Sequence, residues 1–537
     1  MKKIRLISIA LIFTFLSQMA VFAKKNTLYS DNIKMIMCSG GKVAITDKAD
    51  TVLAVPPYTD NGNVMLPAKY LLEGCGYDVE ENENTLTAKG NKSISVTADG
   101  SITVDRKSEK LAATENKNGE LFTSADICDY IGKKYNITQN GLFVMFEKNT
   151  ESFDENLLLR LQGIYMSPDG KGSAGTVNAP VGTLDEAKKL AAKYLREYGE
   201  DYPVHIFVKG GLYHFSETVK FDDEIFNSDL NKVVSIESYD DEMPQFTGAQ
   251  TLDTADFIPV SDPYTLARLP KEGRGKVAYI DLKKAGIEQL ENKANVFNYI
   301  YLNDIEQTNA RWPNNGEATV FSVPQTNSFT FSEAAPTRWT EAKNAYVFGH
   351  FSSWRWEWHQ GIIKSVDPAT KTINIVGANG SETMRSSASG TGWYAQNLLE
   401  ELDMPGEWYV DQENMLLYYY PPYKLKNQKL EIMTCNDTLI EFTYGKNISI
   451  KGINFTKCYQ GLLFKGSPKN VTIDKCKFSH QQAYYAVQFP NGAGTLNVTI
   501  TNNEVYNLFG AFCYVKTGNL GRLTDGNCLI KNNVIIQ

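Results

Sequence analysis

Apolar and polar positions alternate in four matching segments near the end of the chain. Each segment opens with asparagine, and the four starts lie 23, 27 and 30 residues apart. The second and fourth positions are apolar in every segment, so each segment predicts a strand with one buried face. The segments are Asn447-Ile448-Ser449-Ile450, Asn470-Val471-Thr472-Ile473, Asn497-Val498-Thr499-Ile500 and Asn527-Cys528-Leu529-Ile530.

Two further columns appear when the segments are aligned at their asparagines. One column is apolar throughout: Phe455, Phe478, Val505 and Ile535. The other becomes polar in the last two repeats: Ile453, Cys476, Asn503 and Asn533. Stacked apolar columns with an asparagine ladder are typical of a parallel β-helix. An ordinary antiparallel sheet is the alternative, but four repeats in register favour the parallel β-helix, in a chain that is mainly β.

An amphipathic helix is predicted well before these repeats. A loop rich in glycine and proline, from Tyr165 to Pro180, leads to Thr183 and Glu186, which are spaced as a capping box, and Gly199 ends the predicted helix. The loop contains Tyr165-Met166-Ser167-Pro168-Asp169-Gly170. This string resembles the opening of right-handed parallel β-helix proteins of the pectate-lyase-like class. The resemblance implies that the helix caps the open end of the first coil, where strand edges would otherwise be exposed.

Residues 24–150 contain a weak internal repeat, which we call the echo. Each copy predicts a strand, a turn, a short amphipathic helix, a glycine stop and a second strand, beginning at Asn61-Gly62 and at Asn118-Gly119. The pattern resembles the copper-amine-oxidase-like N-terminal domain of many secreted bacterial proteins. That resemblance implies a non-catalytic accessory module without a copper site, and the first histidine of the chain is His205, beyond the segment. Residues 151–160 are predicted as a linker to residues 161–537, the predicted β-helix domain.

The seven tryptophans all fall between Trp312 and Trp408, in a region whose strand-like stretches predict a β-sandwich inserted at 255–425. Two phrases in this region are specific: Tyr301-Leu302-Asn303-Asp304 with Ala310-Arg311-Trp312-Pro313-Asn314, and Glu400-Glu401-Leu402-Asp403-Met404-Pro405-Gly406-Glu407-Trp408-Tyr409-Val410-Asp411. Both resemble phrases of secreted β-helix proteins in glycoside hydrolase family 141, which includes fucosidase-type and xylanase-type members. Asp304 departs from the pattern, which usually has glycine there. Together with the cap and the coils, the resemblance covers about residues 160–537.

The sequence of residues 1–23 predicts a signal peptide. Lys2, Lys3 and Arg5 precede an apolar run, and Val21-Phe22-Ala23 is a small-residue cleavage pattern. We therefore expect a secreted or cell-surface protein, with possible cell-wall association and no membrane span after cleavage. The formal net charge is −8 and becomes three units more negative without the signal. An acidic protein of this kind is a poor candidate for binding nucleic acid.

The residues that ligate metals are not spaced as a metal site. The eight cysteines include no CxxC pair, and the five histidines form no HxH or HExxH pattern. Asp169 lies in a turn and is better explained as a turn residue than as a ligand. We expect neither a metal nor another cofactor, and disulfide pairing stays open.

Six residues are candidates for binding a polysaccharide. Trp354, Trp356 and Trp358 alternate, so they share one face of a strand, where they either stack on sugars or, as the better-supported alternative, pack between sandwich and coils. His480 and Tyr484 follow a coil strand where a groove can form. Arg522 lies in a loop that resembles a family Gly-x-x-Arg-x-Leu phrase, where it either binds ligand or ties the loop.

Catalytic residues stay unassigned at this stage. Glycoside hydrolysis needs two flanking carboxyl groups, and the acidic run Glu400, Glu401, Asp403 and Glu407 is better explained as structural capping and pairing. The function classes are a glycoside hydrolase-like protein, a polysaccharide lyase, and a non-catalytic glycan-binding protein of the cell surface. The last repeat stops inside a coil at Gln537, so we expect a truncated chain that lacks the catalytic coils, has little glycosidase activity alone and self-associates.

Overall fold

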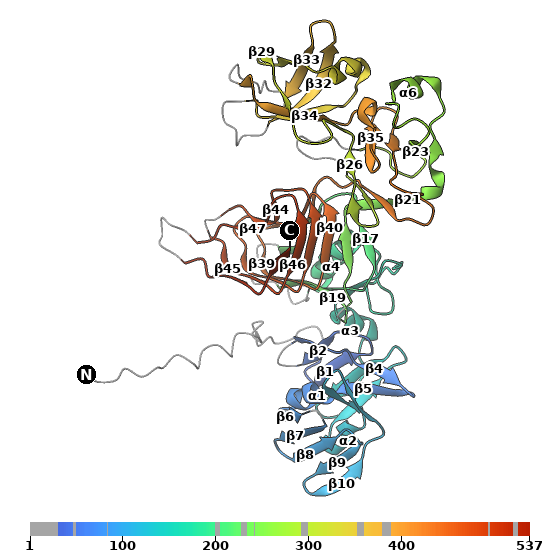
Figure 1. Cartoon of the computed structure of the whole chain (residues 1–537). Coiled ribbons are helices and arrows are strands. Elements are labelled where there is room, and N and C mark those ends of the chain that lie inside the picture. Colours follow the sequence, from blue (N-terminus) through green and yellow to red (C-terminus); the bar gives the residue numbers. More distant parts are fainter. Residues whose placement is uncertain are drawn as a thin grey trace, which may run out of the picture.

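The computed structural model describes residues 30–46, 50–82, 84–198, 204–226, 233–240, 242–290, 299–351, 359–377, 388–491, 494–518 and 525–536 (Figure 1). This part of the chain is mainly β. It contains no helix that is long and apolar enough to cross a membrane. From the N-terminus, the chain forms a small β-rich region, a stack of parallel strands, and a large excursion that leaves the stack and returns to it.

The N-terminal region contains three antiparallel sheets and two short helices. Each predicted copy of the echo forms strand, helix and strand: β5, α1 and β6, then β12, α2 and β13. The first sheet, in the order β13-β14-β1-β2-β3, comprises Lys134–Ile137, Leu142–Phe146, Ile33–Cys38, Val43–Thr46 and Asp50–Val52. The second, β10-β9-β8-β7-β6, comprises Lys107–Lys110, Ser101–Val104, Ser93–Thr97, Thr85–Lys89 and Asp78–Asn82. The third, β11-β12-β5-β4, comprises Thr114–Lys117, Glu120–Ser124, Asn63–Pro67 and Tyr58–Asp60, and the helices are α1 (Ala68–Gly74) and α2 (Ile127–Ile131).

The N-terminal region is packed onto the parallel strands. The residues predicted as a linker, 151–160, overlap helix α3 (Glu155–Leu161), which Asp154 caps and which buries Leu158 and Leu161. Those two leucines belong to the same apolar core as one face of the β13-β14-β1-β2-β3 sheet. Tyr239 also donates a 2.8 Å hydrogen bond to the Gly40 carbonyl. Because the apolar core is continuous, this contact is extensive.

The rest of the chain builds three parallel sheets, which it visits in turn. Every strand pair within these sheets is parallel. The first sheet, β15-β16-β19-β39-β42-β45-β48, comprises Ile164–Met166, Val204–Val208, Val234–Ser238, Lys446–Lys451, Lys469–Asp474, Leu496–Thr501 and Cys528–Lys531. The second, β17-β20-β40-β43-β46-β49, comprises Leu212–His214, Gln245–Thr247, Asn454–Cys458, Lys477–Gln481, Glu504–Leu508 and Val534–Ile536. The third, β18-β38-β41-β44-β47, comprises Val219–Phe221, Thr438–Thr443, Gln460–Lys465, Tyr485–Phe489 and Ala511–Val515.

The apolar columns predicted from the repeats are confirmed as register partners. Phe455 pairs with Phe478, which pairs with Val505 and then Ile535. The Phe455 and Phe478 rings stack at 5.1 Å. The predicted asparagine ladder is also present, since Asn503 accepts from the Cys476 amide at 2.8 Å and donates to Asn533 at 2.8 Å. A second ladder joins Asn447, Asn470, Asn497 and Asn527.

Helix α4 (Leu184–Tyr198) follows the loop where the cap was predicted. The Thr183 amide donates to the Glu186 carboxylate at 3.0 Å and the Glu186 amide donates to the Thr183 hydroxyl at 3.2 Å, so the predicted capping box is formed. The apolar face of α4 joins the core of the parallel sheets and contacts β15 and helix α5 (Asp223–Phe226). It thereby covers the first coil.

The excursion leaves after β20 and returns at β38. It forms three sheets (Figure 1, upper part). The first, β21-β37-β24-β25, comprises Ala249–Leu252, Leu430–Met433, Ile300–Leu302 and Ile305–Glu306. The second, β22-β23-β36-β35-β26, comprises Ile258–Pro259, Ala278–Asp281, Leu416–Tyr419, Glu407–Asp411 and Thr308–Asn309. The third, β27-β34-β31-β32-β33-β30-β29 with β28 beside β34, comprises Arg311–Trp312, Gly392–Gln396, Tyr346–Gly349, His359–Asp367, Thr372–Gly377, Ser328–Thr330, Ser322–Gln325 and Ala318–Thr319. Its short helices are η1 (Thr254–Asp256), α6 (Pro263–Arg268), η2 (Ala335–Glu341) and η4 (Leu399–Glu401).

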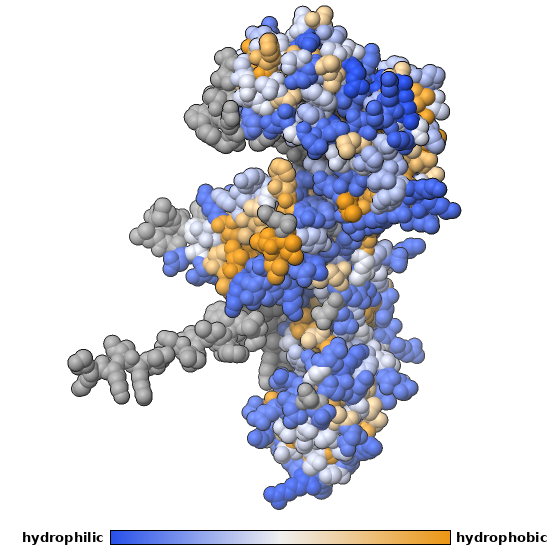
Figure 2. Space-filling model, viewed as in Figure 1, coloured by the Kyte–Doolittle hydropathy of each residue, from blue (hydrophilic) through white to orange (hydrophobic). Residues whose placement is uncertain are grey.

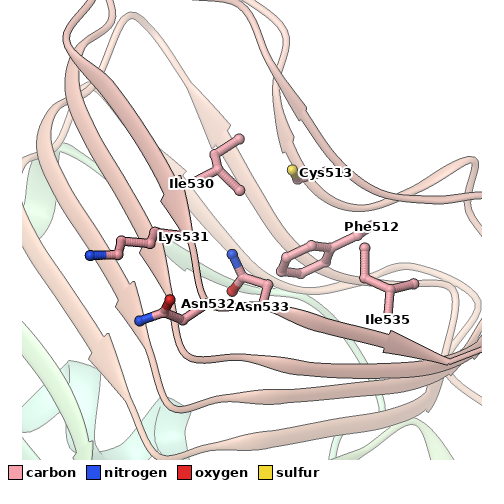
Figure 3. Close-up of a pocket in the computed structure, with 7 residues that line it drawn as sticks. All are labelled: Phe512, Cys513, Ile530, Lys531, Asn532, Asn533 and Ile535. Carbon is pink, nitrogen blue, oxygen red and sulfur yellow. The ribbon is translucent and has the colours of Figure 1, made fainter.

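An apolar cleft lies at the outer edge of the last described coil (Figure 3). Phe512, Cys513, Ile530 and Ile535 line it together with polar residues of the turn between β48 and β49. Figure 2 shows apolar surface at this position, and Leu529, Val534 and Ile536 are about half exposed there, at 49%, 52% and 62%. Ile530 and Ile535 continue the interior columns. The apolar wall of the cleft is therefore an extension of the core.

Candidate functional site at the corner of the coils

Three polar residues occupy matching positions where the second sheet ends and the chain turns into the third. Register pairs on either side align Lys457, His480 and Asn507 in successive coils. All three have left-handed backbone conformations, with φ of 49°, 50° and 51°. The same conformation recurs at other turns of the coils, as at Asn470 and Asn497, so it marks the sharp bend of the chain at each corner. We call these three residues the corner column.

A hairpin of the excursion lies against the corner column. Strands β24 and β25 are joined by Asn303 and Asp304, whose φ values of 52° and 64° are those of a two-residue hairpin turn that favours glycine. Asn303 is held by Tyr423 at 3.1 Å and by Gln428 at 2.7 Å. The Asp304 carboxylate is thereby fixed beside Lys457, with which it forms an ion pair.

The Lys457 ammonium is shared by two carboxylates. Lys457 and Glu431 are each 1% exposed and form an ion pair, whereas Asp304 is 63% exposed. Lys429 adds a second cation, 3.0 Å from Glu431 and 3.8 Å from Asp304. The hydrogen bond from Lys457 lowers the pKa of Asp304, with partial burial opposing it. Asp304 is therefore an exposed, ionised acceptor, while Glu431 is enclosed by lysines.

His480 lies between two tyrosine rings at the centre of the corner column. Its ring is 5.3 Å from Tyr301 and 5.9 Å from Tyr506, edge-on to both. Nε2 lies 3.3 Å from the Asn507 amide nitrogen, and Nδ1 is buried with no hydrogen bond among the described residues. Burial, and then the Lys457 charge, lower the pKa of His480. The imidazole is consequently neutral at pH 7, so Nε2 can accept the Asn507 N–H.

Aromatic side chains follow the corner column at the turn into the third sheet. Tyr459, Tyr484 and Phe509 occupy this turn in successive coils, and Tyr484 and Phe509 are 67% and 76% exposed. Backbone bonds join the turns, from the Ala483 amide to the Tyr459 carbonyl at 2.7 Å and from the Ala511 amide to the Tyr484 carbonyl at 2.8 Å. Polar groups and exposed rings thus run side by side along the coils, the combination that recognises amphipathic ligands.

Two of the six residues proposed from the sequence meet at this corner: His480 and Tyr484. Trp354, Trp356, Trp358 and Arg522 lie outside the described residues. Sequence reasoning missed Asp304, Glu431, Lys457 and Asn507 as partners of His480. One signal was available, since Asp304 stood where a turn favours glycine, but its partner lies 153 positions later in the chain.

The acidic run in the excursion has structural partners. Glu400 accepts from Arg268, and Glu401 accepts from Arg338 at 2.6 Å and from the Trp339 indole at 2.7 Å. Glu407 accepts the Asp403 and Met404 amides, both at 2.9 Å. Burial raises the pKa of Glu401 and of Glu407 to about 7 despite these bonds. All three carboxylates are 2–3% exposed, so a polymer cannot reach them.

Over the described ranges, no group of three or more His, Cys, Asp and Glu side chains is arranged to hold a metal ion. At the corner, the space between Asp304 and Glu431 is occupied by the Lys457 ammonium. The chemistry of this site is therefore that of an ion-paired, partly aromatic hydrogen-bonding surface.

Comparison with known proteins found a family model that matches part of the N-terminal region. Residues 22–125 match the copper amine oxidase N-terminal domain, which agrees with the resemblance of that segment. A search of curated proteins found no match.

The chain is also similar to solved structures. A structure titled "Glycoside hydrolase" is 15% identical, with a TM-score of 0.45 over 65% of this chain and 79% of that one. "The complex structure of XylC with xylose" is 10% identical, with a TM-score of 0.26 over 65% of this chain and 59% of that one. A tailspike of Pseudomonas phage phi297 is 10% identical, with a TM-score of 0.11 over 61% and 48%.

Proposed function

We propose that the chain is a secreted carbohydrate-active protein that binds polysaccharide at the corner column. In this proposal the three parallel sheets form a right-handed parallel β-helix related to glycoside hydrolase family 141. Residues 1–23 are the signal peptide, 24–150 the accessory domain, and 255–425 a sandwich inserted in the 161–537 domain. Polysaccharide of plant, host or cell-wall origin is the expected partner.

One observation carries the proposal: Lys457, His480 and Asn507 occupy matching positions at one corner of successive coils, beside the exposed rings of Tyr484 and Phe509. Asp304 and Asn507 offer exposed acceptor and donor groups for sugar hydroxyls, and Tyr484 offers an apolar ring face for a sugar ring.

Hydrolysis at this corner needs a carboxyl group that donates a proton and a second carboxylate across the bond. Asp304 is held ionised by Lys457, and Glu431 is enclosed between two lysines at 1% exposure. Neither Asp304 nor Glu431 is therefore suited to be the proton donor, whereas burial raises the pKa of Glu306, the cross-strand partner of Tyr301. This observation favours a second candidate function, in which the chain binds polysaccharide at the corner without cleaving it.

Retention on insoluble polysaccharides tests the proposal, with release of reducing ends and of ultraviolet-absorbing products measured in parallel. We expect retention on at least one plant or host polysaccharide, and loss of that retention in His480→Ala and Asn507→Ala. His214→Ala is the matched control, because His214 lies on the same sheet, three strands away from His480 in the order β17-β20-β40-β43.

The products distinguish the function classes. Reducing ends without new absorbance indicate a hydrolase, an absorbing unsaturated product indicates a lyase, and retention without turnover indicates a binding protein. Retention that survives His480→Ala, or no retention on any polysaccharide, would overturn the corner as the binding site.

A further inference from the structure

We infer that Glu306 is a specificity-determining residue of the corner and that it selects the glycan by charge. A sugar that carries a free amine is preferred to a neutral sugar, and a neutral sugar is preferred to a uronate. The inference rests on the proposed function and specifies the chemical class of the ligand at the same corner. It concerns a carboxyl group that the excursion, through β25, brings to the coils.

Glu306 lies at the end of a row of side chains that crosses the first sheet of the excursion. The register of this sheet pairs Glu431 with Tyr301, and Tyr301 with Glu306. Residues directly opposite each other on neighbouring strands point to the same face of a sheet. That face lies against the coils, because Glu431 forms its ion pair with Lys457 there.

Each step along this row matches one step along the coils. Glu431 contacts the first member of the corner column, and the Tyr301 ring lies 5.3 Å from the ring of His480, the second member. Neighbouring strands in a sheet are about 4.8 Å apart, and the same spacing separates the coils. Glu306, one step further along the row, is therefore level with Asn507, the third and exposed member of the column.

The Glu306 carboxyl has no partner within the part of the chain that the structure describes. Its side chain is exposed, and it makes neither a hydrogen bond nor an ion pair there. The other two carboxylates of the corner, Asp304 and Glu431, share two lysines. Those lysine charges are thus balanced, and Glu306 is the carboxyl group that remains without a cation.

The surroundings of Glu306 favour a cationic ligand. Partial burial raises the pKa of Glu306, and no cation among the described residues opposes this. Its charge contributes in turn, after burial, to the raised pKa values of Tyr299 and Tyr301. A nearby ammonium group stabilises the ionised form of a carboxyl group, and it does so more strongly beside protein than in bulk water. The amine of the ligand therefore supplies the cation that the chain lacks at this position.

A uronate meets the opposite situation at this corner. Asp304, on the same hairpin as Glu306, is 63% exposed, and Lys457 lowers its pKa. The Lys457 side chain is 1% exposed, so a ligand does not reach its ammonium group. A carboxylate of the ligand would thus face two carboxyl groups, and like charges in contact cost affinity. The corner is consequently unsuited to the uronates on which a lyase acts.

The remaining polar groups of the corner do not distinguish an amine-bearing sugar from a neutral one. Asn507 is exposed, and the Nδ1 atom of His480 is buried with no hydrogen bond among the described residues. Both side chains are uncharged at pH 7, so they bind the hydroxyl groups that the two kinds of sugar share. A difference in affinity between the two sugars therefore reports on Glu306.

Calorimetry with matched ligands tests the inference. The ligands are β-1,4-linked trisaccharides of glucosamine, glucose and glucuronic acid, at about pH 6, where an amine is protonated. We expect the glucosamine trisaccharide to bind about tenfold more tightly than the glucose trisaccharide. The glucuronic acid trisaccharide should bind at least about tenfold more weakly than the glucose trisaccharide. Higher ionic strength should reduce the preference for the amine, because salt screens the ion pair.

A pair of variants assigns the preference to one carboxyl group. Glu306→Gln should weaken binding of the glucosamine trisaccharide about tenfold, to the level of the glucose trisaccharide. Glu504→Gln is the matched control, because it makes the same change of charge on β46, at an exposed carboxylate that is paired with Lys477 at 2.7 Å. It should keep the preference for the amine. Melting temperatures within a few degrees of the unmodified chain exclude misfolding as the cause.

The outcomes separate this inference from the proposed function. Retention on a polysaccharide that requires His480, together with equal affinity for the glucosamine and glucose trisaccharides, would overturn the inference and leave the proposed function standing. Tightest binding of the glucuronic acid trisaccharide, a preference for the amine that survives Glu306→Gln, or no binding of the glucosamine trisaccharide would do the same. No retention on any polysaccharide, with no binding of any trisaccharide, would overturn both.

Discussion

Asp304 and Lys457 are 153 positions apart in the chain and form an ion pair at the contact between the excursion and the coils. Asp304 belongs to the turn between β24 and β25, and Lys457 to the end of β40. Glu431 of β37 is the second carboxylate paired with the Lys457 ammonium. The ion-pair group therefore joins three separate segments of the chain. The ion-pair group fastens the hairpin against the corner column and sets the charge around His480.

Removal of the central cation tests this role. We expect Lys457→Met to lower the free energy of unfolding by about 3 kcal/mol, because Glu431 remains buried with only part of its compensation. Lys429 stays 3.0 Å from Glu431, which keeps the loss at the low end of the range for broken buried pairs. Urea denaturation measures it.

A double variant distinguishes the loss of attraction between Lys457 and Glu431 from the cost of leaving Glu431 buried without its cation. Glu431→Gln combined with Lys457→Met should be less destabilised than Lys457→Met alone, since no unpaired buried charge remains. Equal or greater destabilisation in the double variant would contradict the burial of Glu431 as the cause.

The apolar column gives a second prediction. Phe478 is fully buried between Phe455 and Val505, so Phe478→Ala should cost about 3–5 kcal/mol through the cavity that it leaves. Phe509→Ala, at a residue 76% exposed, should change stability by no more than about 0.5 kcal/mol. Similar losses in the two variants, measured by thermal unfolding, would refute the register of the coils.

The repeats made the parallel strands and their columns predictable. The alternation at Ile448 and Ile450 and its recurrence are local signals, and in this structure each predicted partner is the observed one. The helix α4 was predictable for the same reason, because Thr183 and Glu186 are only three positions apart in the sequence. When a repeated pattern is aligned with itself, the alignment predicts which residues of neighbouring strands are paired, with little need to know contacts elsewhere in the chain.

Only part of the candidate site at the corner of the coils was predictable from the sequence. His480 and Tyr484 follow a predicted strand, so their place at a turn could be inferred. The charge around them could not, because Asp304 and Glu431 reach the corner through an excursion whose strands pair over long separations. Lys457 gave no local sign of burial, since lysine is rarely buried unless paired. That pairing arises only in the folded chain.

The turn that carries Asp304 gives a third prediction. Asp304→Asn should change stability by no more than about 1 kcal/mol, because Asp304 is itself 63% exposed, Lys457 keeps its ion pair with Glu431, and asparagine tolerates positive φ. Asp304→Val should cost about 1–3 kcal/mol more, because a β-branched residue is strained at φ of 64°. Thermal unfolding that ranks valine with asparagine would show that the hairpin turn is not formed as described.

Glu401 gives the last prediction, a pH dependence of stability. Burial raises its pKa from an ordinary 4.5 to about 7. Between these values the folded state holds a proton that the unfolded state has released, so stability falls as pH rises through this window. Glu401→Gln, which keeps an acceptor for the Trp339 indole, should remove part of this dependence, by at most about 3 kcal/mol between about pH 5 and pH 8. Because Glu407 is shifted in the same direction, a residual slope should remain in the variant and decrease further in Glu401→Gln with Glu407→Gln. Urea midpoints at the two pH values measure this, and an unchanged slope in Glu401→Gln would show that the carboxyl group is ionised in the folded state throughout.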